Sequence, residues 1–290
     1  MFRATTGFRI ILLILFVLMM TPFIANARTW YVKQDGSGDA PTISAAVDSA
    51  VAGDTVLVAP GTYETGDINL KEGLIVTSET GAVSTKIIPK PYTYPLFLFY
   101  CENFHSYMRT EISGFWVEGF QYGWSGGGAI FINSCYEVYV ENNVMTRNKG
   151  AISIEFAAVV GSTLYIQGNT FVSNIENAIY GGGSTHWGYI ENNIIWDHCA
   201  DIGIYLNLMC NCFIDLEDIP PSWRGVNFSL DPQFCGTSEN GNLYLQSDSP
   251  CAPGNSPLGT WCDLIGALPV ACGTAPTKKT TWGALKNIYR

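Results

Sequence analysis

The sequence predicts an all-β fold of the solenoid kind, in which the chain winds through successive parallel coils. The main observation is a repeat, because the segments 138–144, 164–170 and 188–194 read VYVENNV, LYIQGNT and GYIENNI. Each copy is a short alternating strand that ends in turn residues, and the copies are 26 and 24 residues apart. The composition agrees, since 30 glycines and only 14% charged residues suit many turns between buried strands.

The first 27 residues are typical of a secretory signal peptide. Arg3 and Arg9 precede the apolar run 10–20, and Ala-Asn-Ala at 25–27 forms a cleavage site of the A-x-A kind. The apolar run is too short for an ordinary membrane-spanning helix, and no later segment has 18 uninterrupted apolar residues. We therefore expect a mature chain that is secreted, periplasmic or attached to the cell surface, without a transmembrane segment, and that is a monomer.

Acidic residues dominate the mature chain. After removal of 1–27 it has 13 Lys and Arg against 25 Asp and Glu, a formal net charge of −12. Such a surface repels a phosphate backbone, so we exclude nucleic acid as a partner. The apolar and glycine content argues against disorder and fits one compact domain.

A short capping helix is predicted at the start of the mature chain. The apolar positions of 41–50 fall at helical spacing, namely Ile43, Ala46, Val47 and Ala50. Proline at 41 suits the first turn of a helix, and glycine at 53 lies just beyond its end. A strand over 55–59 and a Pro-Gly turn follow. Because the first coil of a solenoid would otherwise expose its apolar interior, we expect the helix to cap it.

The remaining strands follow the order of the coils. Ala-Ile or Gly-Ile pairs predict a further strand in each coil, at 129–130, 151–152, 178–179 and 203–204. Earlier coils are expected around 74–76, 87–88 and 112–117, and 90–108 is expected to form a loop or an irregular coil. In the first repeat copy, strand alternation directs Val138 and Val140 inward and Tyr139 and Glu141 outward.

Three groups of residues carry a family resemblance. They are the segment 42–63, the triplets ENN, QGN and ENN at 141, 167 and 191, and the ending at 231–235, 248–251 and 264–267. Together they resemble the entry segment, coils and closing region of secreted bacterial β-helix proteins of the pectin-lyase-like superfamily, over about 30–272. The resemblance implies a single-stranded, right-handed parallel β-helix. The superfamily includes lyases, hydrolases, esterases, epimerases and non-catalytic adhesins, so the resemblance does not select a function.

We therefore divide the chain into a signal peptide at 1–27, a β-helix domain at 28–272 and a tail at 273–290. The β-helix domain ends in a disulfide-rich closing region. The composition changes in the tail. The tail is either a docking or sorting segment, or a short helix or a mobile terminus.

All nine cysteines lie in the mature chain. In an exported protein we expect them to form disulfides and not metal thiolates, because exported proteins meet an oxidising environment. Cys251 and Cys262 bracket a Pro- and Gly-containing loop and are the first expected pair. Cys235 with either Cys210 or Cys212 is the second. Spacing does not fix the connectivity, and an odd number leaves at least one free thiol.

Two columns of outward residues are expected on one wall, because equivalent positions of successive coils stack about 4.8 Å apart. They consist of Tyr139, Tyr165 and Tyr189, and beside them Glu141, Gln167 and Glu191. Aromatic rings stack on sugars while carboxylates and amides bond hydroxyl groups, so we hypothesise that this surface binds a polysaccharide or a cell-surface glycan. The alternative is that the tyrosines only stabilise neighbouring strands.

A third column is expected four residues after each repeat asparagine. It contains Arg147, Ser173 and Asp197, and a weaker alignment of Asn211 with Asn193 adds Asp215. Asp197 and Asp215 could ligate calcium, and Arg147 could act as a catalytic base. The resemblance implies the same chemistry, since pectate lyases of this fold use calcium carboxylates with an Arg or Lys base. The chain lacks the Asp-Asp, Gly-His-Gly, Arg-Ile-Lys and Asp-Pro-His segments of polygalacturonases and alginate epimerases.

The sequence thus supports two main hypotheses of function. The first is an exported β-helix with an elongated acidic and aromatic surface, which binds carbohydrate or serves as a cell-surface scaffold without a cofactor. The alternative is a calcium-dependent polysaccharide lyase or a related carbohydrate-active enzyme. A structural repeat protein without any ligand is a third.

Overall fold

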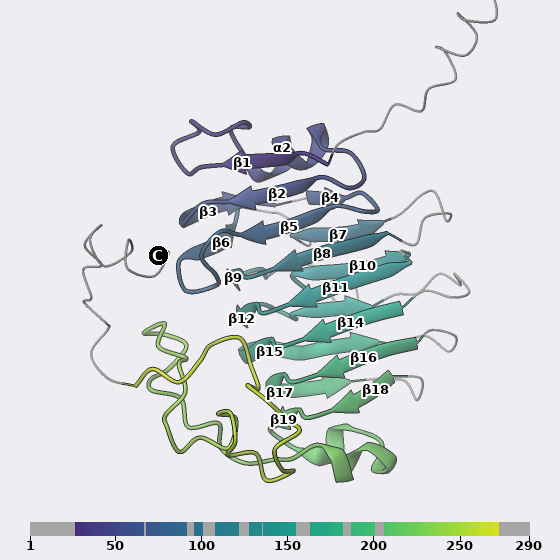
Figure 1. Cartoon of the computed structure of the whole chain (residues 1–290), viewed down its shortest axis with the longest axis vertical. Coiled ribbons are helices and arrows are strands. Elements are labelled where there is room, and N and C mark those ends of the chain that lie inside the picture. The colour runs from purple at the N-terminus through teal and green to yellow at the C-terminus, as the bar shows by residue number, and fades with distance from the viewer. Residues whose placement is uncertain are drawn as a thin grey trace, which may run out of the picture.

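A computed structural model describes residues 27–272, except 67, 92–95, 101–107, 122–127, 135, 155–162, 182–186 and 201–205. Its named strands all pair in parallel and stack into one elongated β-helix (Figure 1). The predicted fold class is therefore confirmed. The predicted signal peptide, apart from residue 27, and the predicted tail lie outside the described residues.

One flat sheet, which we call wall A, runs the length of the stack. Its eight described strands are β1 (Thr29–Val32), β2 (Thr55–Val58), β5 (Ile75–Ser78), β8 (Arg109–Ser113), β11 (Glu137–Glu141), β14 (Thr163–Gln167), β16 (Trp187–Glu191) and β18 (Leu206–Met209). The repeat copies supply β11, β14 and β16. Because the pairing is in register, equivalent residues of these copies lie directly beside each other.

The second sheet bends and supplies two further walls. Wall B contains β3 (Gly61–Thr65), β6 (Thr85–Pro89), β9 (Trp116–Glu118), β12 (Val144–Thr146), β17 (Ile194–Ala200) and β19 (Cys212–Phe213). Wall C contains β4 (Ile68–Leu70), β7 (Phe97–Tyr100), β10 (Ile130–Ser134) and β13 (Ile152–Ile154). The long strand β15 (Thr170–Gly181) joins the two, because its start pairs with β12 and its end with β13.

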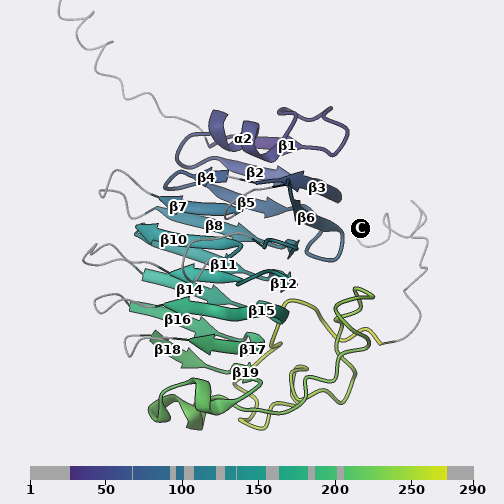
Figure 2. The ribbon, with the colours of Figure 1, turned by 180° about the vertical axis from the view of Figure 1, so that it is seen from behind.

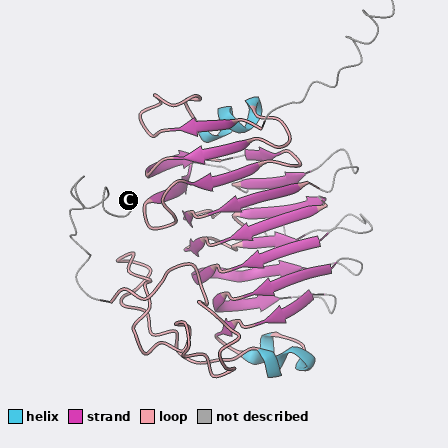
Figure 3. Cartoon of the chain, in the orientation of Figure 1, coloured by secondary structure: helices cyan, strands magenta, loops and turns pink. Residues whose placement is uncertain are grey.

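The capping helix is α2 (Ile43–Ser49), at the N-terminal end of the stack (Figure 3). The Thr42 hydroxyl accepts a hydrogen bond from the Ala45 N–H at 3.1 Å and so caps the first turn. Ile43, Ala46 and Val47 are buried and continue the apolar core of the coils. The prediction of a helix that covers the first coil is confirmed.

The interior of the coils is a continuous apolar core. Val138 and Val140 are buried, whereas Tyr139 and Glu141 lie on the outer side of wall A, as predicted. Six phenylalanines fill the interior almost without exposure: Phe97, Phe99, Phe115, Phe120, Phe171 and Phe213. Burying one such ring stabilises the fold by about 1.5–3 kcal/mol.

A ladder of buried asparagines, the corner ladder, follows the corner between walls A and B. Its members are Asn143, Asn169, Asn193, Asn211 and Asn227. Each side-chain nitrogen donates to the side-chain oxygen of the next member, at 2.9–3.2 Å. The spacing falls from 26 and 24 residues to 18 and 16, so the last coils are shorter than the repeat. The predicted stacking of the repeat asparagines is confirmed.

The residue before each ladder member makes the turn at this corner. These residues form the turn row, and four of them have a left-handed backbone, with φ of 54°, 63°, 56° and 58° at Asn142, Gly168, Asn192 and Cys210. Asparagine and glycine are the residues that adopt this conformation most easily. This explains why the repeat has Asn or Gly at this position.

After the last coil the chain turns back along the stack. It passes through the 3-10 helices η1 (Leu216–Asp218) and η2 (Pro221–Val226) and then forms an irregular closing segment, 227–272. Leu243 and Leu268 of this segment pack with Trp116, Val144 and Val172 of wall B. Figure 2 shows the closing segment, green to yellow, beside β12, β15 and β17. In the part of the chain that the structure describes, no helix is long and apolar enough to cross a membrane.

Candidate functional site

The predicted tyrosine column exists on the outer side of wall A. Tyr139 pairs with Tyr165, and Tyr165 with Tyr189, across adjacent strands. The ring centroids of successive tyrosines are 4.4 and 5.2 Å apart, with interplanar angles of 8° and 9°. Burial, the charge of Glu137 and the neighbouring Tyr165 raise the pKa of Tyr139 to about 12. All three phenols therefore lie close together, and that of Tyr139 is held in its neutral form.

This stacking changes what the tyrosines can offer to a ligand. Each ring covers the face of its neighbour, so the column presents ring edges and phenol oxygens to solvent, not a row of open faces. We expected aromatic faces available to sugar rings. The inner faces are instead used between the strands, where aromatic pairs stabilise the sheet by about 0.2–1 kcal/mol each.

Arg109 closes one end of the stack, and the sequence analysis missed it. Its guanidinium carbon lies 3.8 Å from the Tyr139 ring centroid. Its nitrogens contact the carboxylates of Glu111 and Glu141, both at 2.6 Å. Strand β8 lacks the repeat, so only its register against β11 could have revealed this residue.

The second column lies beside the tyrosines, at the carboxyl ends of the same strands. Gln167 lies opposite both Glu141 and Glu191, and its amide donates to the Glu191 carboxylate at 3.1 Å. Burial raises the pKa of Glu141 above its ordinary value, although Arg109 opposes this. We call the two columns together the strip: Tyr139, Tyr165, Tyr189, Glu141, Gln167 and Glu191.

A groove borders the strip where the closing segment returns to the corner. We call it the corner groove. Its volume is about 330 Å³, and its lining is Glu141, Asn142, Gln167, Gly168, Asn192, Asp263, Leu264 and Gly266. The Gly266 N–H donates to the Asn192 carbonyl at 2.7 Å and so holds the closing segment against the turn row. Sequence analysis could not find this groove, because its two sides lie about a hundred residues apart in the chain.

The third predicted column is wrong at Asp197. Arg147 and Ser173 do stack, since the Arg147 N–H donates to the Ser173 carbonyl at 3.2 Å. Asp197 instead aligns with Asn174, whose side-chain nitrogen donates to its carboxylate at 2.6 Å. Asp197 thus follows Asn148 and Asn174 in a second, part-buried ladder, in which the Asn148 side-chain nitrogen donates to Asn174 Oδ1 at 3.1 Å. The coil is one residue shorter here than in our alignment, which moves Asp197 from the outer turn to a position with 8% exposure.

Arg147 lies between wall B and the closing segment. Its guanidinium forms an ion pair with Glu118 on the preceding coil and donates to the Ser238 carbonyl at 3.0 Å. Burial opposes the charge of Glu118, but Lys86, Arg147 and the Trp116 N–H outweigh it and lower the Glu118 pKa. Arg147 thus joins wall B to the closing segment as a charged, paired group.

Asp215, the third member of the predicted catalytic and calcium set, is the N-cap of η1. Its carboxylate accepts from the Glu217 N–H at 2.8 Å. Among the described residues, no three His, Cys, Asp or Glu side chains are grouped so that they could hold a metal ion. Each of these residues has a partner of its own in the structure, and the catalytic and calcium roles of Arg147, Asp197 and Asp215 stay predictions.

The disulfides differ from those expected. Cys210 pairs with Cys262, and Cys235 with Cys272, so the predicted pairs Cys251–Cys262 and Cys235 with Cys210 or Cys212 are wrong. Cys210 lies in the turn row, where the closing segment returns, and so reaches Cys262. Leu245 forms β-bridges with Phe234 and with Val270. These two residues lie close in sequence to Cys235 and Cys272, so the two cysteines come together.

Cys212 and Cys251 are free, buried thiols inside the closing segment's apolar cluster. A hydrogen bond with the Cys212 thiol, together with burial, raises the pKa of the Cys251 thiol far above its ordinary value. The Cys251 thiol is therefore not a reactive thiolate.

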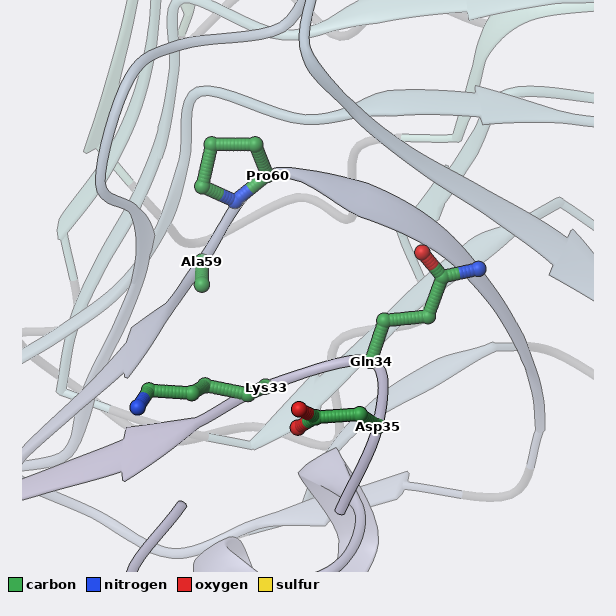
Figure 4. Close-up of a pocket in the computed structure, with 5 residues that line it drawn as sticks. All are labelled: Lys33, Gln34, Asp35, Ala59 and Pro60. Carbon is green, nitrogen blue, oxygen red and sulfur yellow. The ribbon is translucent and has the colours of Figure 1, made fainter. Parts of the chain in front are cut away.

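A second hollow, of about 470 Å³, lies near the N-terminal cap and is lined by Lys33, Gln34, Asp35, Ala59 and Pro60 (Figure 4). Two of its polar side chains are engaged locally. The Gln34 amide donates to the Thr62 carbonyl, and the Asp35 carboxylate accepts from the Ser37 N–H, which lowers the Asp35 pKa.

The strand pairing shows that the chain is a parallel β-helix. No protein-family model matches the chain, and no curated protein matches it. It is similar to the crystal structure of pectate lyase Pel9A, with 14% sequence identity and a TM-score of 0.28, over 86% of this chain and 98% of that chain. At this TM-score nothing about activity can be carried over.

Proposed function

We propose that the protein is exported and binds an extended polysaccharide of neutral or amino sugars along the strip, as a binding or scaffold protein of the cell surface. One observation carries this proposal. Three successive coils repeat a phenol and a carboxylate or amide at the same two positions, in register on one open wall. A polymer with a repeating unit can meet such a surface with the same contact several times.

The exposed groups of the strip suit hydroxyl groups. Phenols donate and accept hydrogen bonds, and the carboxylates of Glu141 and Glu191 accept them. The ring edges add apolar contact beside these polar atoms. This combination of apolar surface and a few placed polar groups is typical of small-ligand sites.

The charge of the strip selects among polysaccharides. It carries two carboxylates, and the adjacent cation, Arg109, already contacts two carboxylates and the Tyr139 ring. A uronic acid polymer would bring like charges to this surface and be repelled. Neutral or amino sugars would not.

Export is supported by the predicted signal peptide and by the disulfides. Cys210–Cys262 and Cys235–Cys272 both link the closing segment, and such bonds persist in oxidising compartments.

Retention on immobilised polysaccharides tests the proposal. We expect the wild-type protein to be retained on at least one neutral or amino-sugar polymer. The double variant Tyr165→Phe/Glu191→Gln keeps the ring stack but removes a hydroxyl and a charge, and we expect it to be retained roughly ten-fold less, equivalent to about 1.4 kcal/mol.

The matched control is Tyr244→Phe, the same loss of a hydroxyl at a tyrosine packed in the closing segment. It should be retained like the wild type. Failure of the wild type to bind any polymer, or equal retention of the double variant, would refute a binding role for the strip.

A further inference from the structure

The turn row has one glycine where the repeat would accept asparagine. Gly168 lies between Asn142 and Asn192, and the three have φ of 63°, 54° and 56°. Because both neighbours adopt the same left-handed conformation with a side chain, the backbone does not require glycine at 168. Because Gly168 has no side chain, it leaves space at the floor of the corner groove.

The space is narrow enough for a single side chain to change it. A Cβ atom at position 168 would lie 2.6 Å from Asn142 Oδ1. That oxygen is the end of a flexible side chain, so it can shift, but the carboxamide and the new side chain would then both occupy the groove. The open groove thus depends on the missing side chain at 168.

The groove contains hydrogen-bond acceptors that have no partner among the described residues. Asn192 Oδ1 is buried and has no partner among the described residues. A buried acceptor left unpaired is destabilising, so a donor in the groove would remove that penalty. The Asp263 carboxylate is exposed and contacts no donor in the described parts of the chain, and Glu141, which is paired with Arg109, supplies a second carboxylate.

We propose that the corner groove is a subsite for the protonated amine of an amino sugar within the bound polysaccharide. An ammonium group has three donors and a positive charge, and the groove combines Asn192 Oδ1 with two carboxylates. This inference rests on the proposed function, because the groove borders the strip and shares Glu141 and Gln167 with it. A neutral hydroxyl would satisfy one acceptor but leave the Asp263 carboxylate uncompensated, since only Glu141 is paired with Arg109.

The experiment compares two probes that differ only at the nitrogen. They are a linear glucosamine oligomer and its fully N-acetylated counterpart, measured by calorimetry at mildly acidic pH, where the free amine is protonated. We expect the wild-type protein to bind the amine oligomer at least roughly ten-fold more tightly than the acetylated one.

The deciding variant is Gly168→Asn, which gives the turn row the asparagine that the other two copies have. We expect it to fold normally and to lose the preference for the amine oligomer. Asp263→Asn is a second variant, which removes charge without adding volume, and it should weaken amine binding only. Gly36→Asn is the matched control, because Gly36 also has positive φ, at 74°, but a Cβ there meets nothing within 4 Å.

Three results would overturn the subsite. They are equal binding of both oligomers by the wild type, unchanged preference in Gly168→Asn, or loss of the preference in Gly36→Asn. If the two oligomers bind equally and strip variants still lose retention, the subsite is wrong and the proposed function stands. If no polysaccharide is retained at all, both fail.

Discussion

At the scale of single residues, asparagine contributes to this fold in two ways. In the turn row its tolerance of a left-handed backbone makes the corner, and in the corner ladder its amide satisfies buried backbone groups. Asn193 shows the second role. Its oxygen accepts from the backbone and side-chain nitrogens of Asn169, and its nitrogen donates to the Ile166 carbonyl and to Asn211. One side chain thus connects three successive coils.

Replacing Asn193 by alanine is therefore expected to be costly. The change leaves several buried groups unpaired, at about 1–3 kcal/mol each, so we expect a loss of roughly 3–5 kcal/mol in the free energy of unfolding. Urea denaturation measures this loss. The control is Asn207→Ala on β18, a partly exposed asparagine of wall A, for which a change within about 0.5 kcal/mol is expected. Equal losses in the two variants would contradict the ladder's role.

At the scale of elements, the sequence predicted the structure of the repeated segments. It did not predict the structure of the segments that depart from the repeat. The capping helix, the three repeat strands of wall A and the stacked tyrosines all follow from periodicity, and the register of these strands is as expected. The position of Asp197 was missed because one coil is a residue shorter, which a fixed spacing does not reveal. The disulfides and the corner groove were missed because they depend on how the irregular closing segment folds back.

The closing segment offers a test at this scale. The Cys210–Cys262 disulfide joins it to the turn row directly beside Asp263. We expect the variant Cys210→Ser/Cys262→Ser to lose about 2–4 kcal/mol of stability, since a crosslink over a long loop is removed. Hydrogen exchange should then increase at 263–266. The matched variant Cys235→Ser/Cys272→Ser should leave exchange at 263–266 unchanged, and increased exchange there in both variants would show that the first disulfide has no special role at the groove.

At the scale of the whole molecule, the acidic balance of the chain acts on every ligand in the same direction. The formal net charge is −10 for all 290 residues, and the strip and corner groove both carry carboxylates. The long-range field attracts a polycation, is neutral toward an uncharged polymer and repels a polyanion. This is a property of the surface as a whole, so it should be visible in salt dependence even before any single contact is changed.

Ionic strength therefore separates the three classes of polysaccharide. Affinity for a glucosamine oligomer should fall steadily as salt is added, because screening shortens the Debye length to about 8 Å at physiological ionic strength. Retention on a neutral polymer should change little, since hydrogen bonds and apolar contact carry it. A uronic acid polymer should not be retained at low salt, where repulsion is strongest. Tight retention of a polyuronate at low salt, lost on adding salt, would show that a cationic surface binds it and that wall A is not the binding face.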